Sequence, residues 1–285
     1  MTGFKDLLVI LDHSTACAAR LDVAVHVASR FGAHLTGLFV TPSPNIPALA
    51  GSEFPAHART VAERMEVQRQ AWREAVLAAQ QLFRSRTDRA GITTEWRERA
   101  GDVAEIASLH ARYGDLVIVG QMDPAPSAVH SGRALPERLL LGVGRPVLVV
   151  PYAGVFTTVG ERVLVAWNAS REATRAVNDA LPILQRASHV TVLAINPRGD
   201  VSGDGDVPGA DLALHLSRHG VKAEAAWIKA EDIEVAVMLL SRACDLQADL
   251  IVMGGYGHSR VREIVLGGAT REMLRTMTVP ALMSH

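Results

Sequence analysis

The chain contains few of the residues that mark several common protein classes. Cysteine occurs only as Cys17 and Cys244 in 285 residues, too few for a disulfide framework and without the spacing of metal ligands. Lysine occurs only as Lys5, Lys222 and Lys229, and none of them follows a glycine-rich turn, which excludes a P-loop. No apolar run approaches the roughly 18 residues that span a bilayer. The sequence therefore predicts neither a disulfide-rich domain, nor a P-loop ATPase, nor a membrane-spanning protein.

The chain also lacks an excess of charge of either sign. Its 29 basic and 30 acidic residues give a formal net charge of −1, which predicts no basic surface for nucleic acid or anionic membranes. Hydrophobic residues make up 48% and charged residues 21%, proportions typical of a globular chain. The apolar run after Lys5 and Asp6 is much shorter than the core of a signal peptide. We therefore expect a cytoplasmic protein that binds neither nucleic acid nor membranes.

Two copies of one pattern follow each other along the chain. Residues 7–14 correspond to 163–170, 34–42 to 189–197, 114–120 to 248–254, and 145–150 to 279–284, in the same order and with similar spacing. A repeat of this size indicates a duplicated domain. We predict domains at 1–152 and 161–285, and the first domain carries an insertion at about 41–61.

Each half alternates between short apolar runs and longer amphipathic stretches. Continuous runs of Val, Ile and Leu predict strands that are buried on both faces of a parallel sheet. The helical stretches between them, such as 16–31 and 104–113, imply right-handed crossovers. The fold class is therefore α/β, with two doubly wound parallel sheets of five strands each. The predicted strands include 7–11, 35–40, 115–120 and 146–150 in the first half, and 162–167, 189–195, 222–228, 249–253 and 279–284 in the second.

A long helix is predicted over residues 62–90. Five apolar residues recur there near helical spacing, and we expect this stripe to pack in the core: Met65, Trp72, Val76, Ala79 and Phe83. The insertion before the helix contains several prolines. It has two interpretations, a cover for a pocket or partner surface, or a surface loop.

The densest glycine cluster follows the fourth strand of the second half. In an open parallel sheet, ligands bind beyond the carboxyl ends of the strands, so this position points to a binding site. The cluster consists of Gly254, Gly257, nine further residues, and then Gly267, Gly268, Ala269 and Thr270. Free amides at the start of the helix predicted over 269–277 suit a phosphate, and the Thr270 hydroxyl adds a donor. The alternative is that the glycines only form turns and allow close packing of helix and sheet.

These residues resemble the universal stress protein family, and the duplication is similar to its tandem-domain members. The resemblance rests on the strand ends Asp12-His13-Ser14 and Asn168-Ala169-Ser170, the turns at Pro42 and Pro197, and the glycine cluster, and it covers nearly the whole chain. It implies a Rossmann-like, adenine nucleotide alpha hydrolase-like fold with strand order 3-2-1-4-5 in each half. It also implies that the second half binds ATP, with or without magnesium, through Ala166, Trp167, Asn168, Ile195, Met253, Gly254, Tyr256, Gly257, Gly267, Gly268, Ala269 and Thr270.

The second half departs from the family pattern at three of these positions. Asn168 replaces the usual aspartate and loses its charge, and Gly268 replaces a serine or threonine but keeps its backbone amide. Trp167 is bulky for its position, so it either stacks on a base or fills the adenine space. The ATP site is therefore predicted with altered contacts.

The first half departs further from the pattern. Gly120 is followed by Gln121, and the second glycine of the motif is absent. Pro124 and Pro126 lack the backbone N–H donors that a phosphate requires. We predict that this half binds no ATP in the family manner and serves to pair with the second half.

The sequence offers no set of catalytic residues. It has no G-x-S-x-G turn and no nucleophile beside a base, so any ATP hydrolysis is expected to be slow. The function predicted is a non-enzymatic regulatory protein of the universal stress type that binds ATP. The alternative is a nucleotide-free scaffold for a protein partner or a small metabolite. Family members pair through their last strand, so we expect a pseudo-dimer within the chain and a homodimer of chains.

Overall fold

The computed structural model describes residues 3–42, 55–122, 135–197, 207–229, 232–257 and 268–285. Its first half contains β1 (Asp6–Leu11), α1 (Cys17–Phe31), β2 (His34–Thr41), α2 (Pro55–Ala90), β3 (Thr94–Ala100), α3 (Val103–Ala111), β4 (Leu116–Gly120), α4 (Leu135–Gly142) and β5 (Val147–Val150). Its second half contains β6 (Arg162–Trp167), α5 (Arg171–Leu184), β7 (His189–Ile195), α6 (Ala210–Arg218), β8 (Ala223–Ile228), α7 (Val235–Asp245), β9 (Leu250–Gly254), α8 (Gly268–Thr276) and β10 (Ala281–Ser284).

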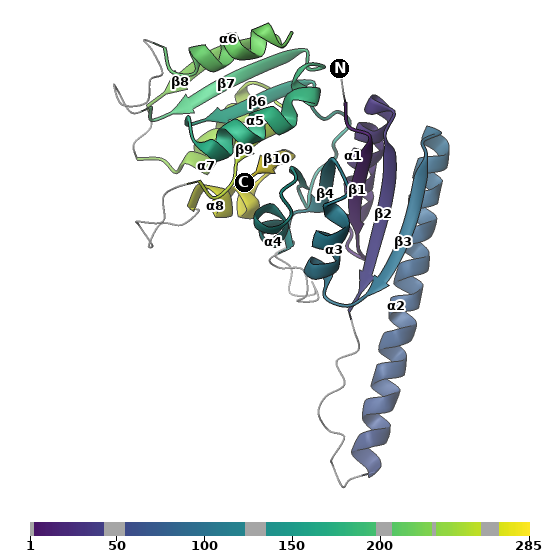
Figure 1. The fold of residues 1–285 in the computed structure, drawn as a ribbon. Coiled ribbons are helices and arrows are strands. Elements are labelled where there is room, and N and C mark those ends of the chain that lie inside the picture. The colour runs from purple at the N-terminus through teal and green to yellow at the C-terminus, as the bar shows by residue number, and fades with distance from the viewer. Residues whose placement is uncertain (1–2, 43–54, 123–134, 198–206, 230–231, 258–267) are drawn as a thin grey trace.

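All ten strands form one sheet in the order β3-β2-β1-β4-β5-β10-β9-β6-β7-β8 (Figure 1). The first half thus has the predicted order 3-2-1-4-5, and the second half has the same order when its strands are counted from the outer edge, at β8, to the centre. The strands within each half are parallel, whereas β5 and β10 pair antiparallel with Leu148 opposite Leu282. Both leucines are fully buried and stand at equivalent positions in the two halves. The predicted pseudo-dimer through the last strands is therefore present within one chain.

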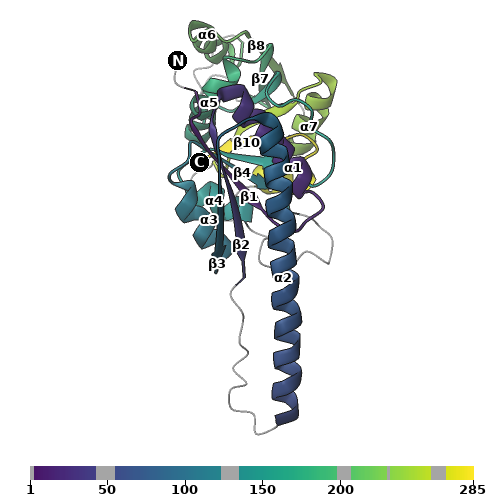
Figure 2. The same ribbon diagram turned by 90° about the vertical axis from the view of Figure 1, so that its right-hand side faces the viewer.

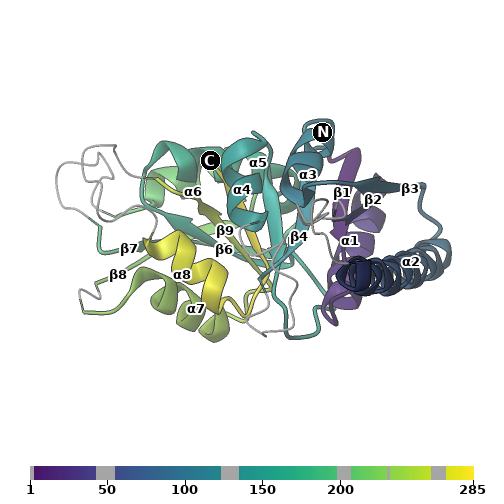
Figure 3. The same ribbon diagram turned by 90° about the horizontal axis from the view of Figure 1, so that it is seen from below.

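Apolar side chains on the two faces of the sheet form two core clusters. One cluster joins α1, α2, α5 and α6 to the strands, and the other joins α3, α4, α7 and α8. Figure 3 shows α7 and α8 side by side at one end of the molecule and α1 and α2 at the other. Because the residues of the inner strands alternate between the two clusters, these strands are largely apolar, as expected for a parallel sheet covered on both faces, whereas the edge strands β3 and β8 carry exposed polar residues.

The helix α2 is longer than the sequence predicted. It starts at Pro55 rather than at residue 62, so the end of the predicted insertion is helical, while residues 43–54 lie outside the described part of the chain. With 36 residues it is about 54 Å long, and it extends well beyond the sheet (Figure 2). Of the predicted stripe, Val76, Ala79 and Phe83 are buried in the core and Trp72 packs against it, whereas Met65 lies on the projecting part. None of the described helices is long and apolar enough to cross a membrane.

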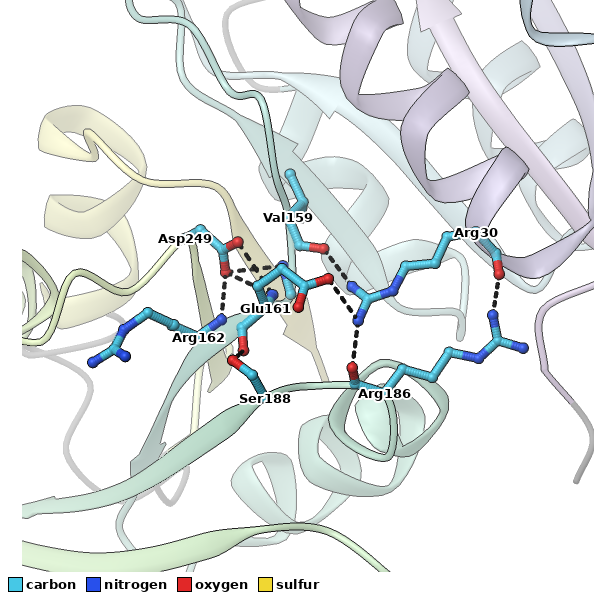
Figure 4. Close-up of polar contacts among 8 residues, drawn as sticks. Arg30, Val159, Glu161, Arg162, Arg186, Ser188 and Asp249 are labelled. Carbon is cyan, nitrogen blue, oxygen red and sulfur yellow. Dashed lines mark hydrogen bonds and ion pairs between the residues drawn. The ribbon is translucent and has the colours of Figure 1, made fainter.

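The linker between the halves is held from both sides by polar contacts (Figure 4). Asp249, just before β9, accepts hydrogen bonds from the amides of Gly160 and Arg162, each at 3.0 Å. From the first half, Arg30 at the end of α1 donates to the carbonyl of Val159 at 2.8 Å and lies 3.3 Å from the Glu161 carboxylate. These contacts fix the point at which the second half begins.

Candidate functional site

The candidate site lies at the carboxyl ends of β9, β6 and β7, which are neighbours in the second half of the sheet. Met253, Ala166 and Ile195 stand at these strand ends, and all three pack with the cluster beneath α7 and α8. The structure thus brings together three of the residues that the family resemblance assigned to the ATP site. Their side chains supply an apolar surface next to the strand ends, where a doubly wound sheet binds its ligands.

Backbone strain is concentrated at the same edge. Four non-glycine residues have a left-handed backbone in the described ranges, and three of them follow these strands: Ala169 (φ 56°), Asn196 (φ 49°) and Tyr256 (φ 55°). The described residues of the first half contain none. Such conformations cost about 1–3 kcal/mol each and cluster where a binding site requires them. Among the described residues, the non-glycine left-handed conformations after strand ends therefore all lie in the second half.

Two glycines of the turn after β9 lie close to the start of α5. A Cβ at Gly254 would lie 2.5 Å from the backbone nitrogen of Ala173, so this strand end packs directly against the start of α5. A Cβ at Gly257 would lie 2.6 Å from Oε2 of Glu172 and 3.4 Å from Oγ of Ser170. These distances agree with the alternative prediction that the glycines allow close packing of helix and sheet. Gly257 also lies beside the Glu172 carboxylate, a neighbour that the sequence had not indicated.

The start of α8 combines an anchored hydroxyl with an open position. The Thr270 side chain is buried, and its Oγ1 accepts a hydrogen bond from the Tyr256 amide at 3.1 Å, so it holds the turn after β9. Gly268 faces open space. A cavity of about 400 Å³ lies here between the first turns of α7 and α8, lined by Glu234, Val235, Ala236, Gly268, Ala269, Arg271 and Glu272. Gly267 lies outside the described residues.

Neither Asn168 nor Trp167 packs beside Ala166: the Asn168 side chain is exposed, and Trp167 lies on the opposite face of the sheet. The Asn168 side chain is exposed and accepts a hydrogen bond from the Ser170 amide at 3.2 Å, while Ser170 caps α5 by accepting from the Ala173 amide at 3.1 Å. Trp167 packs against the opposite cluster from Ala166, and its ring lies 3.9 Å from the position of a Cβ at Gly209. The Trp167 side chain therefore leaves the sheet on the face opposite that of Ala166, and the two roles predicted for it stay predictions.

The equivalent crevice of the first half is filled by an arginine. Arg20 extends from α1 and is only 2% exposed, and its guanidinium makes two hydrogen bonds to Asp12, at 2.8 and 3.0 Å. A Cβ at Gly120 would lie 3.1 Å from this guanidinium. The pair therefore spans the gap between the ends of β1 and β4, which is the switch point of the topology. In the second half, Ala176 stands at the position of Arg20.

The charge of Asp12 is stabilised by its neighbours. Burial opposes ionisation, but the Arg20 guanidinium and the hydrogen bonds from Ser14 outweigh it, so the pKa of Asp12 lies below its ordinary value. Arg20 is correspondingly held in its charged form, and its pKa is raised although burial alone would lower it. The first-half crevice thus contains its own matched pair of charges.

Sequence reasoning had not identified Arg20 and Glu172 as relevant residues. A signal for Arg20 was available, since it is a charged residue on the apolar face of a predicted helix where the second half has alanine. Glu172 gave no signal, because its proximity to Gly257 arises only when α5 packs beside β9. Within the described ranges, no group of three or more His, Cys, Asp or Glu side chains is arranged to hold a metal ion.

Comparison with protein families gives one match that covers both halves. The model described as "Universal stress protein family" matches residues 3–151 and again residues 160–285. A curated relative, universal stress protein Slr1230 from Synechocystis sp. (strain ATCC 27184 / PCC 6803 / Kazusa), is 29% identical over 174 residues, or 59% of this chain. The match spans only 57% of that relative's own length.

Solved structures share the arrangement over nearly the full length. A universal stress protein from Archaeoglobus fulgidus DSM 4304 has a TM-score of 0.68 at 18% identity, with 98% of this chain and 95% of that chain covered. A functionally unknown protein, PA1789 from Pseudomonas aeruginosa PAO1, has a TM-score of 0.59 at 14% identity, with 99% and 92% covered. At these identities the two structures establish a common fold.

Proposed function

Because the chain belongs to the universal stress protein family, with two family domains in tandem, we propose that its second half is a regulatory site that binds ATP. The observation that carries this proposal is the strained edge, where Ala169, Asn196 and Tyr256 hold left-handed conformations after three neighbouring strands. Folding alone gives no reason to retain three such residues side by side, whereas a ligand that contacts those turns does.

Each part of the edge has a role suited to one part of ATP. The apolar side chains of Ala166, Ile195 and Met253 form the surface for the adenine ring. The cavity beside Gly268 lies at the first turn of α8, where backbone N–H groups without helical partners and the positive end of the helix dipole favour phosphate. Asn168 is exposed at the end of β6 and offers amide and carbonyl groups to the nucleoside.

Magnesium is proposed to enter with the triphosphate. Mg²⁺ commonly binds through one or two carboxylates together with phosphate oxygens. Glu172 provides a carboxylate at this edge, because its Oε2 lies within 2.6 Å of the Cβ position of Gly257. The metal would neutralise the repulsion between this carboxylate and the phosphates.

The first half is proposed not to bind ATP. The Arg20–Asp12 pair fills its switch point, and the positively charged group is already neutralised by a carboxylate. One nucleotide per chain is therefore expected. Since β5 and β10 already pair within the chain, the homodimer that we propose must use another surface.

The proposed role is regulatory rather than catalytic. None of the described strand-end residues is placed as a general base for an attacking water, so we propose at most slow hydrolysis. ATP would act by binding one conformation or assembly more tightly than another, which shifts their populations. We propose that this takes place in the cytoplasm.

Thermal unfolding with and without saturating ATP and magnesium tests the proposal directly. A ligand at 1,000 times its dissociation constant stabilises the native state by about 4 kcal/mol, and this gives a clear rise in the unfolding temperature. Protein freed of copurified nucleotide is required as the starting material. An unchanged unfolding temperature would reject the ATP site and favour a nucleotide-free scaffold that binds a protein partner or a small metabolite.

A further inference from the structure

The turn after β9 in the second half is packed against a helix of the first half. Gly255 is buried there, and a Cβ on it would lie 2.4 Å from Cδ2 of Leu140 in α4. The Gly255 amide also donates to the Ser284 carbonyl at 2.8 Å, and its carbonyl oxygen lies 3.0 Å from Nδ1 of His285. The turn is therefore held between the last strand of its own half and α4 of the other half.

The next residue along the turn faces the same helix. The Tyr256 hydroxyl oxygen is buried, and burial together with the neighbouring Glu137 carboxylate of α4 raises the pKa of Tyr256. Its backbone is left-handed, which an aromatic side chain rarely adopts. The Thr270 hydroxyl holds the Tyr256 amide, and the Tyr256 side chain packs with the core cluster that includes Leu140 of α4.

Glu137 also reaches the second helix of the candidate site. Its carboxylate lies 3.9 Å from Nε of Arg271, in the first turn of α8 and on the wall of the 400 Å³ cavity. One helix of the first half thus contacts both the turn after β9, through Leu140, and the helix that follows that turn, through Glu137. Those two segments flank the proposed phosphate position.

We propose that α4 of the first half positions the ATP site of the second half, with Glu137 and Leu140 as its positioning residues. The inference rests on the proposed function. It gives the first half, whose own crevice is closed by Arg20, a defined task in ligand binding. Glu137 and Leu140 do not contact the ligand; they hold Gly255, Tyr256 and Arg271 in the geometry that binds it.

The turn after β4 in the first half contacts the last helix of the second half in a different way. Gln121, the counterpart of Gly255, is buried, donates to the Arg275 carbonyl of α8 at 3.0 Å, and accepts from the Tyr152 amide at 3.1 Å. Each half therefore rests its post-strand turn on the last helix of the other half. Among the described residues of the two turns, only Tyr256 in the second half has a left-handed backbone, so the contact there holds a conformation that would otherwise relax.

The test compares Glu137→Gln with Arg138→Ala in the full-length protein. Arg138 is the matched control because it is the next residue on α4 but contacts Asp102 of α3, at 3.2 Å, and not the turn. We expect Glu137→Gln to weaken ATP binding, measured by calorimetry with magnesium, by about tenfold, and Arg138→Ala to leave it unchanged.

A second measurement without ligand separates this proposal from the proposed function. Hydrogen exchange at the Tyr256 amide should be faster in Glu137→Gln and in Leu140→Ala than in the wild type. If wild-type protein binds no ATP, the proposed function fails and the positioning role falls with it, whatever the exchange shows. If wild-type protein binds ATP and Glu137→Gln binds it equally well, the positioning role is overturned while the site stands, even if exchange is faster.

Discussion

Arg30 and Arg186 each donate a hydrogen bond to the other's backbone carbonyl across the boundary between the two halves (Figure 4). The two residues stand at the ends of the equivalent helices α1 and α5, where the last carbonyls have no helical partner and carry partial negative charge. Each half therefore neutralises a helix end of the other half. The Arg186 guanidinium also lies over the Phe31 ring, at 4.4 Å from its centre.

The hydrogen bonds between Arg30 and Arg186 predict that removing the two side chains lowers the free energy of unfolding by unequal amounts. The Arg30 side chain is 14% exposed and also binds Val159 and Glu161, so Arg30→Ala should lower the free energy of unfolding by about 2–3 kcal/mol. Arg186 is exposed, and Arg186→Ala should cost no more than about 1 kcal/mol. Urea unfolding measures both, with Arg69→Ala on the projecting part of α2 as the control. Equal losses for the two variants would contradict the burial argument.

The Asp12–Arg20 pair predicts a loss of stability in acid. The pKa of Asp12 is lowered by folding from an ordinary value of 3.8, so the pair contributes fully above about pH 4 and loses its contribution as the pH falls through the lowered pKa. Asp12→Asn should cost about 2 kcal/mol at pH 7. This is less than the ~3–5 kcal/mol of a fully buried pair, because the Asp12 side chain is 44% exposed.

Urea unfolding at pH 7 and pH 3 checks the sign of this effect. The difference in unfolding free energy between wild type and Asp12→Asn should narrow at the lower pH, because the Asp12 carboxyl of the unfolded chain, with its ordinary pKa of 3.8, takes up a proton before that of the folded protein. The double variant Asp12→Asn with Arg20→Ala carries the residues found at Asn168 and Ala176 of the second half, and it should be more stable than Asp12→Asn alone. A difference that stays constant with pH would mean that the ion pair is not its source.

The two glycines after β9 predict opposite outcomes for similar substitutions. In Gly254→Ala the new Cβ meets the backbone of Ala173, which cannot move freely, so we expect a loss of about 3 kcal/mol in stability. In Gly257→Val the new side chain meets the flexible end of Glu172, so stability should change by less than about 1 kcal/mol while ATP binding is lost. Calorimetric titration and urea unfolding of both variants separate the roles. Normal ATP affinity in Gly257→Val would place the phosphates elsewhere.

Sequence patterns predicted the sheet but only part of the site, for physical reasons. Runs of Val, Ile and Leu mark buried parallel strands whatever surrounds them, which is why most strands and the duplication could be predicted, whereas the strand order came from the family resemblance. The face of the sheet on which Trp167 lies could also have been predicted relative to Ala166, because neighbouring residues of a strand point to opposite faces. In the structure Ala166 faces α7 and α8. The Arg20–Asp12 and Glu172–Gly257 contacts depend on how helices dock on the strand ends, which no local pattern contains.

Glu172 predicts how ATP binding depends on magnesium. Its side chain is 14% exposed and its charge is only loosely paired, with Arg171 at 3.5 Å, so it should repel a triphosphate at Gly257. In the wild type, magnesium should therefore strengthen ATP binding by about tenfold, and Glu172→Gln should bind metal-free ATP more tightly and gain little from magnesium. Calorimetric titrations with magnesium and with a chelator measure both affinities, and Glu98→Gln on the exposed edge strand β3 is the control. An equal gain from magnesium in the wild type and in Glu172→Gln would show that the metal, if it binds, is held by the phosphates alone.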